Sequence, residues 1–329
     1  MQKEEIRDTL INQIEPYIYD PLEETKIEIK VNHYVNPKAV LGELYLEKGD
    51  YANAVKYLKM ACESFLNQTS LFKVDQTYAE NAWFTMFLNA EYAGLEHFSV
   101  IPFSATEHQL NPLATWMGYR YDYLVKPSQV LVDSFEAQVS TLGNPGDYFR
   151  GNGFVETGVT YGVDTLSKSS EEDFDVAYYI SKYEMDPSDP FSTDIILQRA
   201  ADMHLLLAEA YNRLGDEESQ YYALMLLNDG VNAELPKPPG FTKWAKNLGI
   251  RGRVKLEPWV LAEDITGEER TLLIEDLIIQ ERSLELAFEG KRWTDLVRVA
   301  ERRGDPAYLA DRVAAKFEGT AMYDQVHST

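Results

Sequence analysis

The chain has 329 residues, more than one hydrophobic core usually serves, so two sub-cores or an array of repeats are expected. Its formal charge at pH 7 is −23 and no basic stripe stands out, which argues against nucleic-acid binding because an acidic surface repels the phosphate backbone. The single cysteine excludes an intramolecular disulfide, and every apolar run is shorter than the roughly 18 residues that cross a bilayer.

The first segment, residues 1–19, has the amphipathic pattern of a helix and ends in the turn-like stretch YDPLEET. It has no apolar core of the kind found in a signal peptide. We therefore expect either that the protein stays inside the cell or that this chain lacks its original amino terminus.

A helical hairpin is predicted over residues 37–66, where KAVLGELYLEKGD is followed by YANAVKYLKMACESFL. Gly49 can end the first helix, and Asp50 can cap the start of the second. Small and large residues alternate as in tetratricopeptide repeats, in which small side chains let two helices approach closely, at Leu41, Gly42, Tyr45, Ala54, Leu58 and Ala61. Cys62 follows in the same apolar pattern and is predicted to be a buried, unreactive thiol.

Residues 67–194 are predicted to form a long, irregular, loop-rich insertion. They contain many Gly, Pro, Asn and Asp residues, as in HQLNPLATWMGYRYDYLVKPS and TLGNPGDYFRGNGFVETGVTYGVDTLSKSSEEDFD. A loop of this length is unusual in a compact domain unless it has a function. We therefore expect the helical repeats to carry this insertion and the insertion to carry the working surface.

A second hairpin is predicted over residues 195–235. LAEAYNRLGD at 207–216 aligns with LGELYLEKGD at 41–50 and shares Leu, Glu, Tyr, Gly and Asp with it. The following helix is out of register, since Gln220 stands where Ala54 did, so two unrelated amphipathic hairpins remain the alternative. A helix over 195–214 would place Arg199 near the middle of its apolar face.

The last framework helices are predicted over residues 263–317 and include the stretch ERSLELAFEGKRW. Glu281, Glu285 and Glu289 follow each other at i, i+4 and i+8, a spacing that suits a catalytic pair, a metal cradle or structural ion pairs. At about 100° per residue, Glu281 lies inside the apolar arc of a helix that runs from about residue 272 to 288, and the other two lie progressively outside it. Only Glu281 is therefore predicted to be buried.

A buried carboxylate needs either a partner or a raised pKa. The predicted partner of Glu281 is Arg199, across a helix–helix interface, and the rival is Arg292 or Arg298 folding back over the turn at Gly290. The three glutamates are therefore interpreted as structural.

Other motifs give no catalytic machinery. The chain has no G-x-S-x-G, no P-loop and no H-E-x-x-H, and no His lies within one turn of the three glutamates, so metal content is left unassigned. No cofactor is expected; Ca²⁺ would suit the acidic loops, but no specific spacing supports it. Pairs such as Asp173 and Asp175 are either a glycosidase's two carboxylates or solvated loop charge, and the second interpretation is favoured. His204, beside an apolar helix face, is predicted to be structural.

Several stretches resemble the SusD/RagB family of surface glycan-binding lipoproteins. They are ILQRAADMHLLLAEAYNRLGD, then LIIQERSLELAFEGKRWTDLVR, with VKPSQVLVDSF, NPGDYFR and the dipeptide KY at 182–183 in support. The resemblance runs from about residue 37 to the end of the chain. It implies one mainly α, SusD-like domain over 1–329, in which tetratricopeptide-like hairpins carry an irregular second half.

The resemblance also implies a function. Such proteins bind oligosaccharides or, in some cases, peptides without cleaving them, and they act as a lid on a TonB-dependent, SusC-like transporter of the outer membrane. This implies a non-enzymatic nutrient-uptake protein at the cell surface. The family's lipoprotein signal, its acylated cysteine and its final return to the scaffold are not found in this sequence, so the chain is expected to be shortened at both ends.

The ligand residues come from composition, since the family stretches above are structural. A sugar needs exposed rings that stack on its C–H faces, with polar side chains beside them. The predicted residues are Trp116, Tyr119, Tyr121, Tyr148, Arg150, Asn152 and Tyr161.

Two other functions remain open. A tetratricopeptide adaptor that binds a peptide would need a concave helical face lined by Asn, Lys and Arg, which an acidic chain supplies poorly. A helical glycoside hydrolase would need two carboxylates about 5–9.5 Å apart in a cleft.

Overall fold

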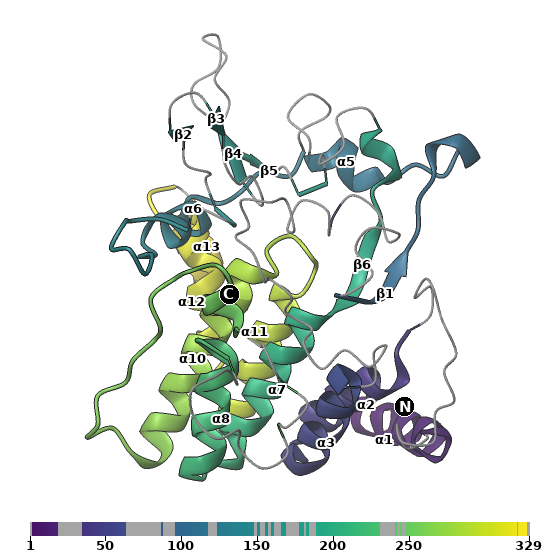
Figure 1. Cartoon of the computed structure of the whole chain (residues 1–329), viewed down its shortest axis with the longest axis vertical. Coiled ribbons are helices and arrows are strands. Elements are labelled where there is room, and N and C mark those ends of the chain that lie inside the picture. Colours follow the sequence, from purple (N-terminus) through teal and green to yellow (C-terminus); the bar gives the residue numbers. More distant parts are fainter. Residues whose placement is uncertain are drawn as a thin grey trace.

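The computed structural model is mostly helical, which confirms the predicted fold class (Figure 1). It describes residues 2–18, 35–63, 87, 96–117, 124–147, 150–151, 155–156, 159–160, 166–168, 178–180, 182–183, 189–230, 241, 244, 248–320 and 322–327. In the view of Figure 1 the long helices form the lower part of the molecule, and the short strands of the insertion lie above them. No described helix combines the length and the apolar character needed to cross a membrane.

The first hairpin consists of α2 (Pro37–Lys48) and α3 (Tyr51–Glu63). The side chain of Asn36 accepts hydrogen bonds from the first free N–H groups of α2, and Pro37 takes the first helical position, where no N–H is needed. Gly49 ends the helix in the left-handed region at φ 80°, and the Asp50 carboxylate accepts a hydrogen bond from Asn53 N. The predicted break between the helices is confirmed.

The second hairpin, α7 (Ala200–Leu214) and α8 (Glu217–Leu227), is built in the same way. Gly215 has φ 84°, and the Asp216 carboxylate accepts a hydrogen bond from Ser219 N. The same Gly-Asp pair therefore makes both breaks, because glycine adopts the left-handed conformation without strain and aspartate caps the next helix. The tetratricopeptide-like geometry of the hairpins and the predicted domain boundaries stay predictions.

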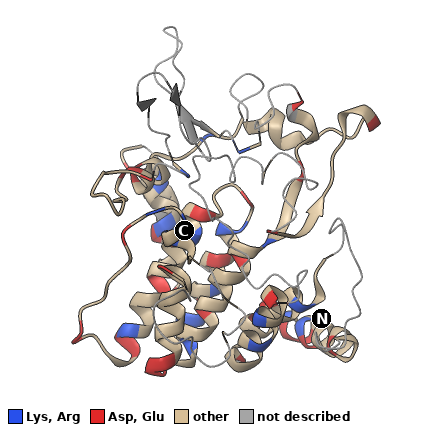
Figure 2. Ribbon diagram, viewed as in Figure 1, with Lys and Arg blue, Asp and Glu red and all other residues tan. Residues whose placement is uncertain are grey.

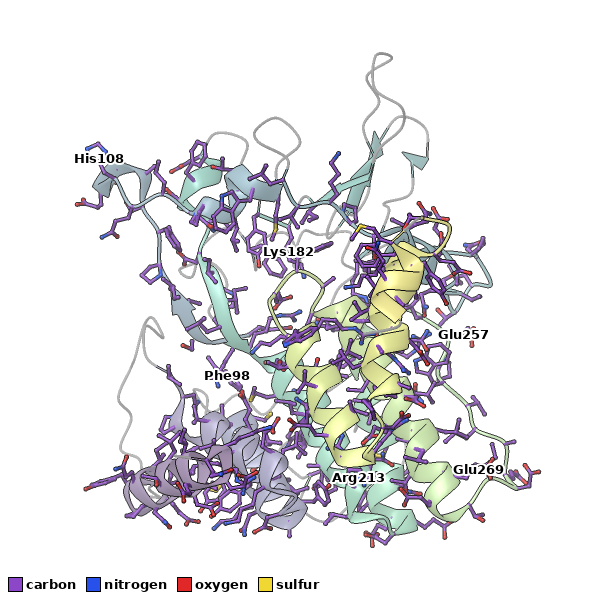
Figure 3. All side chains as sticks on the ribbon, turned by 180° about the vertical axis from the view of Figure 1, so that it is seen from behind. Phe98, His108, Lys182, Arg213, Glu257 and Glu269 are labelled. Atoms are coloured by element: carbon purple, nitrogen blue, oxygen red, sulfur yellow. The ribbon has the colours of Figure 1, made fainter. Side chains whose placement is uncertain are left out.

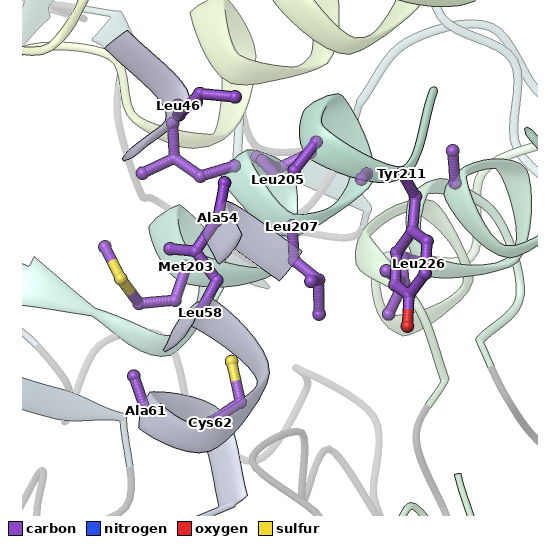
Figure 4. Close-up of a cluster of buried hydrophobic side chains, with 14 of the residues drawn as sticks. Leu46, Ala54, Leu58, Ala61, Cys62, Met203, Leu205, Leu207, Tyr211 and Leu226 are labelled. Carbon is purple, nitrogen blue, oxygen red and sulfur yellow. The ribbon is translucent and has the colours of Figure 1, made fainter. Parts of the chain in front are cut away.

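The main hydrophobic core lies between the two hairpins, where α3 packs against α7 (Figure 4). Ala54, Leu58 and Ala61 of α3 and Met203 and Leu207 of α7 are all 0% exposed. Alanines at this contact let α3 and α7 approach closely.

The start of the second hairpin differs from the prediction. Residues 195–199 form a strand, β6 (Ile195–Arg199), which pairs antiparallel with β1 (His97–Ile101), and α7 begins only at Ala200. β-branched Ile195 and Ile196 favour a strand when a partner strand is available, and that partner comes from the distant insertion. Arg199 is therefore not on a helix face but at the junction of strand and helix.

The remaining described elements are short in the insertion and long in the carboxyl-terminal part. The insertion holds η3 (Ala105–Glu107), α5 (Pro112–Met117), α6 (Gln129–Glu136), β2 (Val155–Glu156), β3 (Val159–Thr160), β4 (Leu166–Lys168), β5 (Tyr178–Ile180) and η4 (Pro190–Ser192). Strands β2 and β3 form one antiparallel pair, and β4 and β5 form another. The other elements are α1 (Lys3–Ile14), η1 (Glu15–Tyr17), α9 (Ile250–Arg253), α10 (Gly267–Glu285), α11 (Arg292–Arg303), α12 (Ala307–Ala314), η5 (Ala315–Phe317) and α13 (Tyr323–His327).

Helix α10 also differs from the prediction, because it ends at Glu285 and not at about residue 288. Residues 286–290 form a turn in which Phe288 has φ 65° and Gly290 has φ 76°. The chain thus leaves the helix one turn earlier than the apolar pattern suggested, and this shift decides where Glu289 lies.

Candidate functional site

The three glutamates at the end of α10 are all buried. The side chains of Glu281 and Glu285 are 0% exposed and that of Glu289 is 2% exposed. The prediction that only Glu281 is buried is therefore wrong. It extrapolated one continuous helix, whereas Glu289 lies in the turn after α10 and its carboxylate returns towards the protein interior.

Glu281 is paired with two arginines, and neither is the predicted one. Its Oε1 lies 2.7 Å from a guanidinium nitrogen of Arg150, and its Oε2 lies 2.7 Å from one of Arg251. The Asp147 carboxylate holds the other side of the Arg150 guanidinium, 2.8 Å from Nε. A turn of the insertion and the segment of α9 thus both reach the same residue of α10.

Arg199 is paired with the other two glutamates, so the predicted Arg199–Glu281 ion pair is wrong. Arg199 lies 2.7 Å from Glu285 Oε1 and 2.7 Å from Glu289 Oε2, and it also donates to the carbonyl oxygen of Glu285. The prediction placed Arg199 on the face of a helix. At the end of β6, its side chain meets the carboxyl end of α10 instead.

These contacts belong to one group of buried charges, which we call the carboxylate cluster. Among the described residues it contains the acids Glu96, Asp147, Glu281, Glu285 and Glu289 and the cations Arg150, Lys182, Arg199, Arg251 and Arg253. Five carboxylates thus face five cations, and the cluster is electrically neutral inside a strongly acidic protein. It joins α10 and the turn after it to five other places in the chain: Glu96 just before β1, Asp147 with Arg150, Lys182, Arg199 at the end of β6, and α9.

The pKa values of the three α10 glutamates follow from these contacts. Burial alone would raise the pKa of Glu285, but the guanidinium groups of Arg253, Arg199 and Arg150 outweigh it and hold the pKa below its usual range. The pKa values of Glu281 and Glu289 are lowered in the same way. A general acid needs a raised pKa and access to substrate, so these enclosed carboxylates suit a structural role and not acid–base catalysis.

A second group of buried charges links α7, α10 and α11. Figure 2 marks the Lys, Arg, Asp and Glu positions along the ribbon. Arg282 pairs with Asp202 at 2.9 Å and with Asp295 at 2.8 Å. Arg298 pairs with Glu209 at 2.8 Å, so it is not the partner of Glu281 that the rival prediction proposed. The other rival, Arg292, donates to the carbonyl oxygen of Ile279.

His204 and Cys62 are structural, as predicted. The imidazole Nδ1 lies 2.7 Å from the carbonyl oxygen of Ala200, the ring packs on Trp244, and burial lowers the pKa of His204 to about 3. Burial also raises the pKa of the Cys62 thiol well above its usual value, which suits an unreactive cysteine. In the described part of the chain, no group of three His, Cys, Asp or Glu side chains is arranged to hold a metal ion.

The structure describes two of the predicted ligand residues, and one of them is exposed whereas the other is buried. Trp116, on α5, is 45% exposed, and its carbonyl oxygen accepts hydrogen bonds from Leu124 N and Val125 N. Arg150 is 0% exposed and enclosed by carboxylates, so its assignment to a ligand site is wrong. Five other predictions lie outside the described residues: Tyr119, Tyr121, Tyr148, Asn152 and Tyr161.

Sequence reasoning missed most of the cluster. Arg251 and Arg253 are not among the predicted residues, and Asp147 and Lys182 appear only within stretches quoted for the family resemblance. One signal was available, because the stretch GIRGRVKL places two arginines between apolar residues of an acidic chain. Buried guanidinium groups require carboxylates, but no spacing along the sequence states which ones.

Comparisons with a family model and with a curated protein both give SusD. A model described as the SusD family matches residues 125–326. A SusD-like protein of Formosa agariphila is 37% identical over 131 residues, which is 40% of this chain and 21% of that protein.

Solved structures share the fold at low sequence identity. A SusD-like carbohydrate-binding protein from Bacteroides fragilis matches with a TM-score of 0.56 and 15% identity, over 99% of this chain and 66% of its own. Another from Bacteroides vulgatus matches with a TM-score of 0.56 and 17% identity, over 90% and 51%. The chain therefore spans between about half and two thirds of the length of these two proteins.

Proposed function

Because the chain belongs to the SusD family, we propose that it binds glycans at the cell surface without cleaving them and delivers them to a TonB-dependent transporter of the outer membrane. Two solved relatives are described as carbohydrate-binding proteins, which supports a glycan as the ligand. The surface location and the SusC-like transporter partner rest on the family resemblance.

The observation that carries the non-catalytic part of the proposal is the pairing of the α10 carboxylates. Glu281, Glu285 and Glu289 are the most regular set of acids in the sequence, and each is enclosed by cations at 2.7–3.0 Å. A glycosidase would need one carboxyl that stays protonated and a second that reaches the sugar. The arrangement supports a rigid framework that displays the insertion.

A peptide-binding adaptor is supported less well. Such a protein needs an open helical face, but every residue of α7 from Ala200 to Asn212 is buried. The face that would form a groove between the hairpins is occupied by the protein's own core.

Trp116 is the described residue best placed to meet a sugar ring. Its indole is 45% exposed on a short helix of the insertion, beside Leu124 and Val125, which are also exposed. Aromatic rings stack on the apolar face of a pyranose and contribute about 1–1.5 kcal/mol each, which is roughly five- to tenfold in affinity.

The test is native electrophoresis in gels that contain amylopectin, xylan, laminarin or pectin, with a reducing-end assay on the same polysaccharides. We expect retardation in at least one gel, no release of reducing ends, and no effect of a chelator on binding. Trp116→Ala should weaken retention about tenfold, whereas Trp293→Ala, which removes another exposed indole on α11, should not.

Two results would contradict the proposal. One is retention of no glycan while a peptide library is bound, which favours the adaptor. The other is hydrolysis that Glu281→Gln abolishes at an unchanged melting temperature. We expect instead that Glu281→Gln destabilises the fold by roughly 3–5 kcal/mol, because it leaves two buried guanidinium groups without a full partner.

A further inference from the structure

The dipeptide Lys182-Tyr183 binds the turn that follows α10. Figure 3 labels Lys182. The Lys182 ammonium donates to the carbonyl oxygen of Ala287 at 2.9 Å and lies 2.8 Å from Glu289 Oε1. The Tyr183 hydroxyl donates to the carbonyl oxygen of Phe288 at 3.0 Å. Two adjacent residues of the insertion thus hold three successive residues of the framework, and both are buried.

The turn that they hold has a strained conformation. Phe288 has φ 65°, a left-handed conformation that a bulky L residue adopts only when its surroundings enforce it. Its own carbonyl oxygen is the acceptor of the Tyr183 hydroxyl, and Phe288 packs against the small apolar cluster formed by Met117, Ile180 and Tyr183. The geometry of the turn and the position of Tyr183 therefore depend on each other.

The same small apolar cluster contains the end of the helix that bears Trp116. Met117 and Leu113 of α5 pack with Ile180 and Tyr183. The other end of α5 is fixed separately, because the Asn111 side-chain amide donates to the carbonyl oxygen of Thr193. The carboxyl end of α5, which carries Trp116, thus rests on Tyr183 and Phe288.

We propose that Lys182 and Tyr183 are positioning residues, which fix the exposed Trp116 indole relative to the helical framework. The contacts run from α10 through the Phe288 turn to Tyr183, and from Tyr183 through Met117 to Trp116. This inference rests on the proposed function only in that Trp116 is taken to meet the glycan. A rigid support is what a stacking residue needs, since a ring that can shift by about 1 Å loses much of its contact.

Replacing Lys182 should affect the position of the insertion more than the overall stability of the protein. If Lys182 is replaced, Glu289 keeps the Arg199 guanidinium at 2.7 Å, so the carboxylate cluster keeps most of its pairing. The carbonyl oxygen of Ala287 loses the hydrogen bond from Lys182, which weakens the contact between the turn after α10 and the insertion. The substitution therefore acts mainly on the link between the turn and the insertion.

The test is ¹⁹F NMR of protein labelled with 5-fluorotryptophan, with the Trp116 resonance assigned by its absence in Trp116→Phe. Tyr183→Phe and Lys182→Met should shift or broaden the Trp116 resonance and leave those of Trp244 and Trp259 unchanged. The matched control is Tyr308→Phe, which also removes one hydrogen bond of a buried tyrosine, to Asp276, but on α12. It should lower the melting temperature similarly and leave the Trp116 resonance in place.

An unchanged Trp116 resonance in both variants would overturn the inference, even if both lose melting temperature, because the dipeptide would then be merely structural. The four polysaccharide gels give an independent measure. Where wild type is retained, Tyr183→Phe should weaken retention about fivefold and have no further effect in a Trp116→Ala background. Retention of wild type in none of the gels would count against the proposed function, and the NMR result alone would then decide the inference.

Discussion

At the scale of single residues, Glu285 makes more ion pairs than its neighbours Glu281 and Glu289. It contacts Arg150, Arg199 and Arg253, and its own backbone carbonyl also accepts from Arg199. Because these cations are buried, each loses most of its hydration on folding and depends on the carboxylate in return. Removing that one negative charge affects three buried guanidinium groups together.

We expect Glu285→Gln to lower the free energy of unfolding by about 3–5 kcal/mol, a fall of roughly 6 °C in melting temperature for a chain of this length. Glu301→Gln is the matched control, since Glu301 pairs with Lys3 at 2.6 Å but is 56% exposed. Exposed pairs contribute about 0–1 kcal/mol, so the control should melt within about 2 °C of wild type. Equal losses in both variants, measured by thermal unfolding, would contradict the role given to the cluster.

The pKa of Glu43, on α2, is raised, whereas that of Glu285 is lowered. Glu43 accepts a hydrogen bond from Gln198, but burial and the nearby Asp202 carboxylate raise its pKa, against the effect of Lys291 and Arg282. A carboxyl whose pKa is higher in the folded than in the unfolded protein binds its proton more tightly when folded. Its ionisation therefore opposes folding above that pKa and has no such effect at pH values where both states are protonated.

Glu43→Gln should consequently raise the melting temperature at pH 8, by about 2 °C, and give no gain at pH 4. The amide keeps an acceptor for Gln198 and removes the charge. Thermal unfolding at the two pH values tests this. A loss of stability at pH 8 would mean that the Glu43 carboxylate is stabilised by its cations and not repelled by Asp202.

At the scale of elements, the close contact between α2 and α3 depends on Gly42, which has no side chain. A Cβ atom at Gly42 would lie 2.5 Å from Leu58 Cγ and 3.1 Å from Leu58 N, far inside van der Waals distance. Leu58 is 0% exposed and cannot move away freely. Gly42 therefore sets how closely the two helices of the first hairpin approach.

Gly42→Ala should destabilise the protein by about 1–2 kcal/mol although alanine is the better helix former by about 1 kcal/mol. Ala52→Gly, at an exposed position of α3, measures the helix propensity effect alone and should also lower stability, by about 1 kcal/mol. Urea unfolding compares the two. If Gly42→Ala proves more stable than wild type, the tight contact with Leu58 is not present in solution.

At the scale of the whole molecule, net charge and buried charge respond to pH in opposite directions. The formal charge of −23 destabilises the compact state at pH 8 through self-repulsion, which fades towards the pI of about 4.6. The buried carboxylates with lowered pKa values act the other way. The pKa of Asp202 falls to about 2, since Lys291 and Arg282 outweigh its burial, and that of Glu209 is also lowered.

These opposing effects predict a maximum in thermal stability. A group with a lowered pKa stabilises the fold above its unfolded value, near pH 4 to 4.5, and that stability is lost as the pH falls further. We expect the melting temperature to rise from pH 8 to about pH 5 and to fall steeply below pH 4. Added NaCl should raise it at pH 8 and have little effect near pH 5. A melting temperature that falls steadily from pH 8 downward would contradict this balance.

The sequence by itself determined the local structure of the hairpins. Gly49-Asp50 and Gly215-Asp216 specify a helix end and a helix start through the φ angle of glycine and the capping carboxylate, and both effects act within a few residues. The structural roles of Cys62 and His204 could be predicted for a similar reason, since each lies in an apolar pattern that buries it.

Only the tertiary structure decided which charges meet. The partners of Glu281 come from residues 150 and 251. Arg199 meets Glu285 because residues 195–199 form a strand with β1, and it meets Glu289 because α10 ends a turn early. A charged residue in an apolar pattern indicates that an oppositely charged partner is needed. It does not indicate which one, because Coulomb attraction depends on distance in space and not on separation along the chain. That is why the sequence indicated a charge-paired framework and the fold alone assigned its pairs.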